Sequence, residues 1–318
     1  MTSVPATVID AADEELSALE SDHDVDVVLA AARGSHAWGA AGPESDYDVG
    51  FVFVQSDLRR YAHVRQPPTT ITSEADRTDV DLEFQGWDVR TFARLLADSN
   101  DGAIDLLRSP IRYRSAYEPD ELAAYVERTV DPMDLYHAWR GIATNNYRKY
   151  VSHHLVRNDD ETVPILETTD DGYVVEAGDG TTTVPADDER YAETQTRPTV
   201  KRNLTITRAA MYARYLWATG ERSEHELPEL EFDRFLSEQA PTVFDAERID
   251  RAHTLLERKR RGEGAETVGD AVGRAFAHPP VEIDPEIHAR DGPNPARLDA
   301  FVDGMIATAR ADDGRSIL

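Results

Sequence analysis

Two aspartates, Asp46 and Asp48, open a segment that becomes entirely apolar, and Ser35 of a Gly34–Ser35 pair precedes Asp46 by eleven positions. In a strand, residues two apart face the same side, so both carboxylates are expected on one face. Such a pair either repels or binds a cation, and Mg²⁺ prefers one or two carboxylates together with phosphate oxygens. Gly34 allows close backbone approach, and the Ser35 hydroxyl with the following amides suits a phosphate. These residues predict metal-assisted chemistry at phosphorus.

A second acidic segment, residues 79–85 (DVDLEFQ), alternates acidic and apolar residues with period two. This is the pattern of a half-buried strand, with Asp79, Asp81 and Glu83 on one face. One of these acids would complete a two-metal site for in-line displacement. A solvent-facing acidic strand explains this segment, taken alone, equally well.

Apolar segments must position these residues. Residues 25–32 form a run of strand length that ends before Gly34, and residues 46–54 form a second predicted strand. Residues 56–78 are polar and contain Pro67–Pro68, which predicts a loop. Helical spacing then predicts helices over the remaining N-terminal segments: 9–21, 88–98 and 103–108.

The rest of the chain is mostly helical in pattern. Apolar residues recur at spacings of three and four in 120–129, 134–156, 199–219, 230–239, 245–261 and 295–311. Residues 157–198 interrupt this pattern with an acidic, Thr- and Gly-rich segment that contains a hairpin-like stretch at 173–185. We expect an α+β protein with three parts: a domain at 1–130, a helical domain at 131–275 carrying the 157–198 insertion, and a tail at 276–318 with a short helix.

Composition excludes several classes of protein. The 318 residues contain no cysteine, which rules out a disulfide scaffold, a thiolate zinc site and a cysteine nucleophile. No apolar run approaches the roughly 18 residues of a membrane span, and residues 1–20 lack a signal-peptide pattern. A soluble, cytoplasmic protein without a membrane partner is expected.

The charge is strongly negative and evenly spread. There are 61 acidic and 34 basic residues, a net charge of −27, and only Lys149, Lys201 and Lys259 are lysines. A uniformly acidic, lysine-poor chain indicates a surface adapted to high salt, where net charge maintains solubility. At molar salt the Debye length is about 3 Å, so this charge does not exclude a nucleic-acid substrate. No basic patch indicates duplex DNA as a partner.

The spacing of Gly34–Ser35, Asp46–Tyr47–Asp48 and a later acidic strand resembles the signature of the DNA polymerase β-like nucleotidyltransferase superfamily. The segment GSHAWGAAGPESDYDVG is most similar to the RNA-repair-associated predicted nucleotidyltransferases of that superfamily. The resemblance extends to NDGAIDLLRSP at 100–110 and LLERKRRGEG at 255–264, and it covers about 25–156 and 199–264. This chain departs from the pattern at three positions: His36 replaces a commoner arginine, Thr91 a lysine and Asp105 a glutamate.

The resemblance implies a nucleotidyltransferase core, a short mixed β-sheet backed by helices, that uses two Mg²⁺ ions and a nucleoside triphosphate (NTP). Asp46 and Asp48 would bind both ions, and Glu83, with Asp81 as the alternative, would bind the ion that activates the acceptor hydroxyl. Gly34 and Ser35, followed by His36, would hold the phosphates. A hydroxyl would attack the α-phosphorus and release pyrophosphate, with catalysis mainly by positioning and charge neutralisation.

Basic residues of the later helices are further candidates. Lys201 and Arg208 are seven apart and share a helix face, from which they could cover the triphosphate; a solvated basic face is the alternative. The cluster Arg258–Arg261 suits either nucleic-acid phosphates or the negative end of a helix dipole.

Three functions remain open on the sequence. The leading one is a Mg²⁺-dependent nucleotidyltransferase whose acceptor is an RNA 3′ end, a protein hydroxyl or a small molecule. The second is a non-catalytic nucleotide-binding regulator or antitoxin-like module, which would not need the metal carboxylates. The third is a helical partner-binding protein, which leaves the paired acids unexplained.

Overall fold

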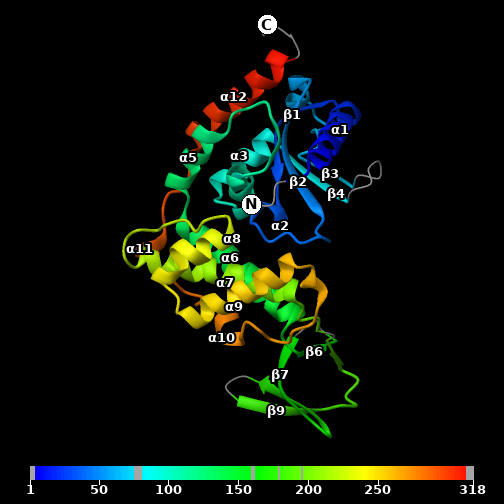
Figure 1. The fold of residues 1–318 in the computed structure, drawn as a ribbon, viewed down its shortest axis with the longest axis vertical. Helices are drawn as coiled ribbons and strands as arrows, with labels where there is room; N and C mark the ends of the chain where they lie inside the picture. Colours follow the sequence, from blue (N-terminus) through cyan, green and yellow to red (C-terminus); the bar gives the residue numbers. More distant parts are fainter. Residues whose placement is uncertain (1–3, 75–80, 159–161, 178–179, 195, 313–318) are drawn as a thin grey trace.

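The computed structural model describes residues 4–74, 81–158, 162–177, 180–194 and 196–312. They form an α+β structure with two five-stranded sheets, and the helices lie mainly between and around them (Figure 1). Of the predicted acidic strand, Asp79 lies outside the described residues. Within the described part of the chain, no helix is both long enough and apolar enough to cross a membrane.

The first sheet has the strand order β3-β4-β2-β1-β5. Its strands are β1 (Val25–Ala32), β2 (Tyr47–Gln55), β3 (Thr70–Glu74), β4 (Leu82–Asp88) and β5 (Arg112–Ser115). The β2–β4 pair is parallel and the other pairs are antiparallel, so the sheet is mixed. β1 and β2 are nearly continuous apolar runs because helices cover both faces of the sheet.

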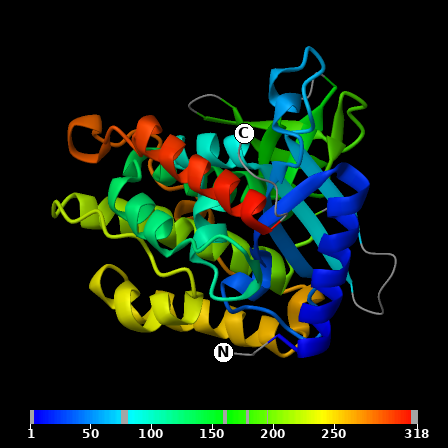
Figure 2. The same ribbon diagram turned by 90° about the horizontal axis from the view of Figure 1, so that it is seen from above.

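Helix α1 (Ala6–His23) covers one face of this sheet, through a cluster that includes Leu16, Phe51 and Phe53. The opposite face packs on α3 (Val89–Ala97) and α4 (Asp101–Arg108). Helix α12 (Pro295–Asp312), from the predicted tail, runs alongside α3 and joins the same core (Figure 2). The C-terminal helix therefore packs on the first sheet.

The helical part is built around α7 (Val200–Gly220), which is buried on most sides. It packs against α6 (Pro132–Tyr150) and α9 (Ala246–Arg260). Side-chain caps start all three helices: Thr199 for α7, Asp131 for α6 and Asp245 for α9. The remaining helices are α2 (Gly34–Ala37), α5 (Asp120–Thr129), α8 (Phe232–Arg234), α10 (Arg274–Ala277), α11 (Pro285–His288), the 3₁₀ turns η1 (Leu58–Ala62), η3 (Ala240–Thr242) and η4 (Glu263–Ala265), and the π-helical turn η2 (Phe235–Gln239).

The second sheet has the order β10-β6-β7-β8-β9 and projects from the helical part (Figure 1). Its strands are β6 (His154–Arg157), β7 (Thr162–Thr169), β8 (Gly172–Ala177), β9 (Gly180–Pro185) and β10 (Tyr191–Glu193). Leu155, Val175 and Val184 form its small buried core. The predicted hairpin at 173–185 is confirmed as β8–β9, within a larger sheet than the sequence indicated.

Two local predictions were wrong. The helix expected over 134–156 ends at Tyr150, and the Leu155–Val156 pair continues instead in β6, where pairing with β7 overrides helical spacing. The loop expected over 56–78 contains η1 and the edge strand β3. β3 alternates Thr70, Ile71 and Thr72, and only Ile71 is buried, so its apolar signal is a single residue.

Candidate active site

Gly34 and Asp48 are held against each other at the end of β1. Gly34 follows β1 with φ of +57°, a left-handed conformation that favours glycine. A Cβ at this position would lie 1.9 Å from Asp48 Oδ2, so only a glycine fits beneath this carboxylate. The Arg33 amide also donates to the Asp48 carbonyl oxygen at 2.8 Å. The motif loop, by which we mean residues 33–46 between β1 and β2, therefore forms one unit with the first residues of β2.

The strand register places Glu83 beside Asp48. The two residues are direct partners across the parallel β2–β4 pair. In each strand the next residue, Val49 or Phe84, is apolar and buried. Asp46 stands just before β2, two positions from Asp48. Asp81 stands before β4, where its carbonyl oxygen accepts from the Tyr47 amide at 3.0 Å. The structure thus gives Glu83 the position in register with Asp48.

These carboxylates repel one another. Burial raises the pKa of Asp48; Arg33 opposes this shift, and the negative charge of Asp46 adds to it. Burial also raises the pKa of Glu83, and the charges of Asp48 and Asp46 raise it further. Uncompensated negative charge of this kind is what a bound cation would relieve.

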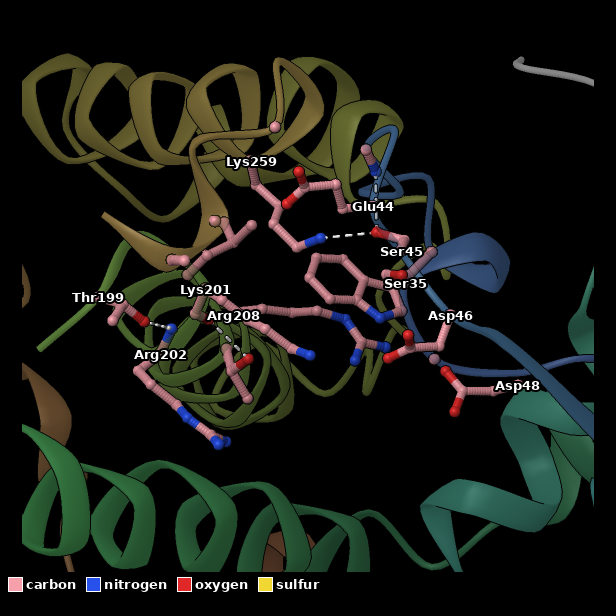
Figure 3. Close-up of a pocket in the computed structure, with 18 of the residues that line it drawn as sticks. Ser35, Glu44, Ser45, Asp46, Asp48, Thr199, Lys201, Arg202, Arg208 and Lys259 are labelled. Carbon is pink, nitrogen blue, oxygen red and sulfur yellow. Dashed lines mark hydrogen bonds between the residues drawn. The ribbon is translucent and has the colours of Figure 1, made fainter. Parts of the chain in front are cut away.

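A cavity of about 620 Å³ opens between the motif loop and the helical part. Ser35, Asp46 and Asp48 line it from the strand side, together with Gly34 (Figure 3). Five basic residues line it from the helical side: Arg197, Lys201, Arg202, Arg208 and Lys259. The structure therefore brings the predicted residues Gly34, Ser35, Asp46, Asp48, Lys201 and Arg208 together around one space.

A second hollow of about 620 Å³ lies on the other side of Asp48. Glu83 lines this hollow rather than the first, and Asp48 lines both. Asp48 therefore stands between a basic cavity and a hollow that contains Glu74 and Glu83.

Arg208 is fixed by its own contacts. Its guanidinium donates to Asp105 Oδ2 at 3.1 Å and stacks over the rings of Trp38 and Tyr212, at 5.0 and 4.7 Å from their centroids. Its buried Nε has no hydrogen-bond partner among the described residues. Lys201 differs, because its side chain is exposed to the cavity and makes no ion pair within the described chain.

His36 lies beside the cavity and packs on Tyr47 at the start of β2. Its ring stacks on Tyr47 with the centroids 4.2 Å apart, and it is absent from the residues that line either hollow. Burial lowers the pKa of this imidazole. The phosphate contact expected of His36 stays a prediction.

Two residues with a place in the site were not singled out from the sequence. Lys259, within the basic cluster 258–261, lines the cavity. The feature of the sequence that could have pointed to it is that the chain has only three lysines. Arg33 lies across β2 in a slot that Gly50 leaves open, because a Cβ at position 50 would be 2.3 Å from Arg33 Cδ. Its guanidinium donates to Gln85 and lies 4.8 Å from the Trp87 ring centroid.

The acidic residues suit Mg²⁺ as partial ligands. In the described part of the chain, no group of three or more acidic or histidine side chains is gathered closely enough to hold a metal alone. Mg²⁺ does not need such a cage, since it commonly uses one or two carboxylates, water and substrate phosphates. Asp46 and Asp48, which face a cavity large enough for a nucleotide, fit that mode of binding.

The chain is similar to known proteins, and one family matches most of its length. The profile of the RlaP family, described as an RNA repair pathway DNA polymerase beta family, matches residues 8–298. The uncharacterized protein YcgL of Bacillus subtilis (strain 168) is 34% identical over 108 residues, which are 34% of this chain and 40% of that protein, so the match spans less than half of the relative. A nucleotidyltransferase-like protein from Exiguobacterium sibiricum 255-15 superposes with a TM-score of 0.31 at 7% identity, over 96% of this chain and 77% of that one.

Proposed function

The chain belongs to the RNA repair pathway DNA polymerase beta family, and from this premise we propose that it is a Mg²⁺-dependent nucleotidyltransferase. It transfers a nucleoside monophosphate from an NTP to a hydroxyl acceptor. The acceptor oxygen bonds to the α-phosphorus, the bond from that phosphorus to the bridging oxygen breaks, the acceptor proton passes to solvent and pyrophosphate leaves.

The opposed charges across the cavity carry this proposal. Asp46 and Asp48 lie on one side, and five basic side chains converge from the other, including two of the three lysines in a chain of net charge −27. Many arginines of this acidic protein, such as Arg108, Arg208 and Arg258, pair with carboxylates. Among the described residues, Lys201, Arg202 and Lys259 make no ion pair. Basic side chains without a carboxylate partner would bind a polyanion, and the two neighbouring carboxylates Asp46 and Asp48 would bind a divalent cation. Mg²⁺–NTP combines both charges.

Each residue then has a distinct role. Gly34 and Ser35 hold the phosphates at the end of β1, and Lys201 with Arg208 neutralises them from α7. Asp46, Asp48 and Glu83 would hold Mg²⁺, which supplies charge stabilisation at the reacting phosphate when bound. Glu83 lies on the acceptor side, because it lines the hollow beyond Asp48. We assign the chemistry to the 1–130 domain and closure over the nucleotide to the 131–275 domain.

We favour an RNA 3′ end as the acceptor, since the family is described by an RNA repair pathway. A protein hydroxyl or a small molecule is the alternative. The second function, a non-catalytic nucleotide-binding regulator, is disfavoured by the carboxylates, because binding alone does not require them. The lysine-poor, acidic composition supports a halophilic setting, so activity is to be sought at high salt.

A labelling experiment tests the proposal. The protein is incubated in molar salt with Mg²⁺, each α-labelled NTP in turn and total RNA; label is then traced to RNA, protein or small molecules. Transfer that requires Mg²⁺ and is lost in Asp46→Asn supports the enzyme. Tight NTP binding without transfer to any acceptor would instead support the regulator.

A matched pair of variants tests the nucleotide-binding face. Lys201→Met removes an unpaired charge and should weaken NTP binding roughly tenfold to a hundredfold, because a hydrogen bond to a charged group contributes about 1.5–3 kcal/mol. Arg108→Gln, which removes a cation that is paired with Glu127 outside the cavity, is the control. Unchanged affinity in Lys201→Met would assign that face of α7 to the solvated surface.

A further inference from the structure

Lys259 is a buried lysine at the end of α9 with an incomplete set of partners. The residue is only 8% exposed, and its ammonium donates to Ser45 Oγ at 2.7 Å. An ammonium has three donors, and this neutral hydroxyl is the one hydrogen-bond acceptor that it meets among the described residues. Gly264 leaves room for the stem, since a Cβ there would lie 2.8 Å from Lys259 Cδ.

The neighbouring cations of the same cluster are satisfied. Arg258 pairs with Glu263 and Glu266, at 2.6 Å in each case, and Arg261 pairs with Glu263 at 2.8 Å. Arg260 pairs with Glu257 at 2.9 Å. Lys259 alone in this cluster lacks a carboxylate within the described residues and alone lines the cavity.

The charge of Lys259 is poorly compensated. Burial lowers the pKa of Lys259, and the positive charge of Lys201 lowers it further, against weaker opposite effects of Asp46 and Glu44. Two like charges therefore face the same space from α7 and α9. A buried cation without a counter-ion is costly, and an anion between the two lysines would remove that cost.

Lys259 also sits where the motif loop rests on the helical part. The Ser45 hydroxyl accepts from the Gly42 amide at 3.0 Å as well as from Lys259, and Ser45 is adjacent to Asp46. The Arg260 Nε donates to the Gly39 carbonyl oxygen at 2.8 Å. Gly42 approaches so closely that a Cβ there would be 2.4 Å from the Lys259 carbonyl oxygen. The end of α9 thus contacts the loop that leads to the metal carboxylates.

We propose that Lys259 contacts the terminal phosphates of the bound nucleotide, and that Ser45 holds its ammonium in the free protein. This inference rests on the proposed function, since it takes the cavity to be an NTP site. Lys259 exchanges a neutral partner for phosphate oxygens when the nucleotide binds. The exchange releases the Ser45 hydroxyl beside Asp46, which couples occupation of the phosphate site to the loop that precedes β2.

Calorimetric titration of a non-hydrolysable NTP with Mg²⁺, and of the matching nucleoside monophosphate, tests this proposal. Lys259→Met keeps the buried stem and should weaken NTP binding about tenfold to a hundredfold, while monophosphate binding changes little. Lys259→Arg should restore much of the loss. Arg261→Gln, which removes a paired cation two positions away, should bind as the wild type does.

Ser45→Ala separates a phosphate contact from a role in holding the loop. If Lys259 reaches phosphate, this variant frees the ammonium and binds NTP at least as tightly as the wild type. If Ser45→Ala weakens binding as much as Lys259→Met, or if Lys259→Met binds normally with an unchanged melting temperature, the proposal is overturned. A wild type that binds no NTP would instead overturn the proposed function itself. Should Lys259→Met fold poorly, the other two variants still test the proposal. NTP binding that is retained in Lys259→Arg and is at least as tight as the wild type in Ser45→Ala supports it, and weakened binding in Ser45→Ala overturns it.

Discussion

Gly34 and Asp48 approach so closely that a Cβ on Gly34 would stand 1.9 Å from a carboxylate oxygen of Asp48. This contact joins the two halves of the motif, the turn after β1 and the start of β2. The backbone at Gly34 is also left-handed, with φ of +57°. The glycine is therefore required twice, by conformation and by space.

Gly34→Ala should abolish most activity. The left-handed conformation costs a non-glycine residue about 1–2 kcal/mol, and the Asp48 carboxylate must move to admit the methyl group. A displacement of about 1 Å at a reacting centre can cost about a hundredfold in rate. Steady-state transfer assays measure this effect, with Gly141→Ala as the control, because a Cβ at Gly141 in α6 meets nothing within 4 Å. Normal turnover in Gly34→Ala would contradict the placement of Asp48.

Asp48→Asn should remove activity without loss of stability. The pKa of Asp48 is raised in the folded protein, so folding disfavours its charged form and stability falls as pH rises through the ordinary range of a carboxyl. Asparagine removes that penalty at neutral pH, and the melting temperature without Mg²⁺ should stay equal or rise. Thermal unfolding with and without Mg²⁺ checks this: the variant should lose any Mg²⁺-dependent stabilisation. A strongly lowered melting temperature would show a structural role.

Glu83→Gln should impair transfer more than Asp81→Asn. Glu83 is in register with Asp48 across parallel strands, whereas the contact made by Asp81 is through its backbone carbonyl and survives the substitution. Turnover and the Mg²⁺ concentration for half-maximal rate are measured for both variants. An inactive Asp81→Asn variant together with an active Glu83→Gln variant would assign the third carboxylate to Asp81 instead.

Much of the strand side of this site can be predicted from the sequence. β1, β2 and the helices after β4 are strongly patterned segments. The expectation that Asp46 and Asp48 face the same side follows from their two-residue spacing and strand geometry alone. Helical spacing also predicts that Lys201 and Arg208 share one face of α7, and both residues line the cavity.

The remaining features depend on contacts between distant segments. β3 carries one buried residue, Ile71, and exists because it pairs with β4. The slot for Arg33 depends on Gly50 and Gly102, which no local pattern connects with it. His36 illustrates a similar limit, since no local pattern predicts that its ring stacks on Tyr47 while its neighbour Ser35 lines the cavity.

Replacing residues 152–195 with a short Gly/Ser linker should leave the rest of the fold intact. The Arg197 amide donates to the Tyr150 carbonyl oxygen at 2.9 Å, so the ends to be joined are close. The second sheet has its own small core, and few of its contacts reach the helices, among them the Arg274–Glu176 ion pair at 2.6 Å. The melting temperature in molar salt should fall by less than about 4 °C, the effect of roughly 1 kcal/mol. A larger fall would mean that the sheet stabilises the helical core.

A hydrogen-bonded chain at the end of α7 links two histidines. Arg290 Nη2 lies 3.0 Å from His225 Nδ1, and a guanidinium only donates, so His225 Nδ1 accepts. His225 Nε2 then carries the proton and donates to His288 Nδ1 at 3.2 Å, and His288 Nε2 donates to Glu221 at 3.1 Å. The chain requires a neutral His225.

His225 should therefore make the protein less stable in mild acid. Burial, Arg290 and His288 lower the pKa of His225, with Asp131 opposing them, so the unfolded chain binds a proton more readily than the folded one. The contribution of neutral His225 to the free energy of unfolding is complete above about pH 6.5, the ordinary pKa of histidine, and it is lost as the pH falls below that value. Urea unfolding between pH 7.5 and 5 should show a shallower pH dependence in His225→Asn, because asparagine tolerates the positive φ of 43° at this position. The exposed His63, changed to asparagine, is the matched control and should keep the wild-type slope. Identical slopes for the wild type and His225→Asn would show that the chain tolerates a charged imidazole.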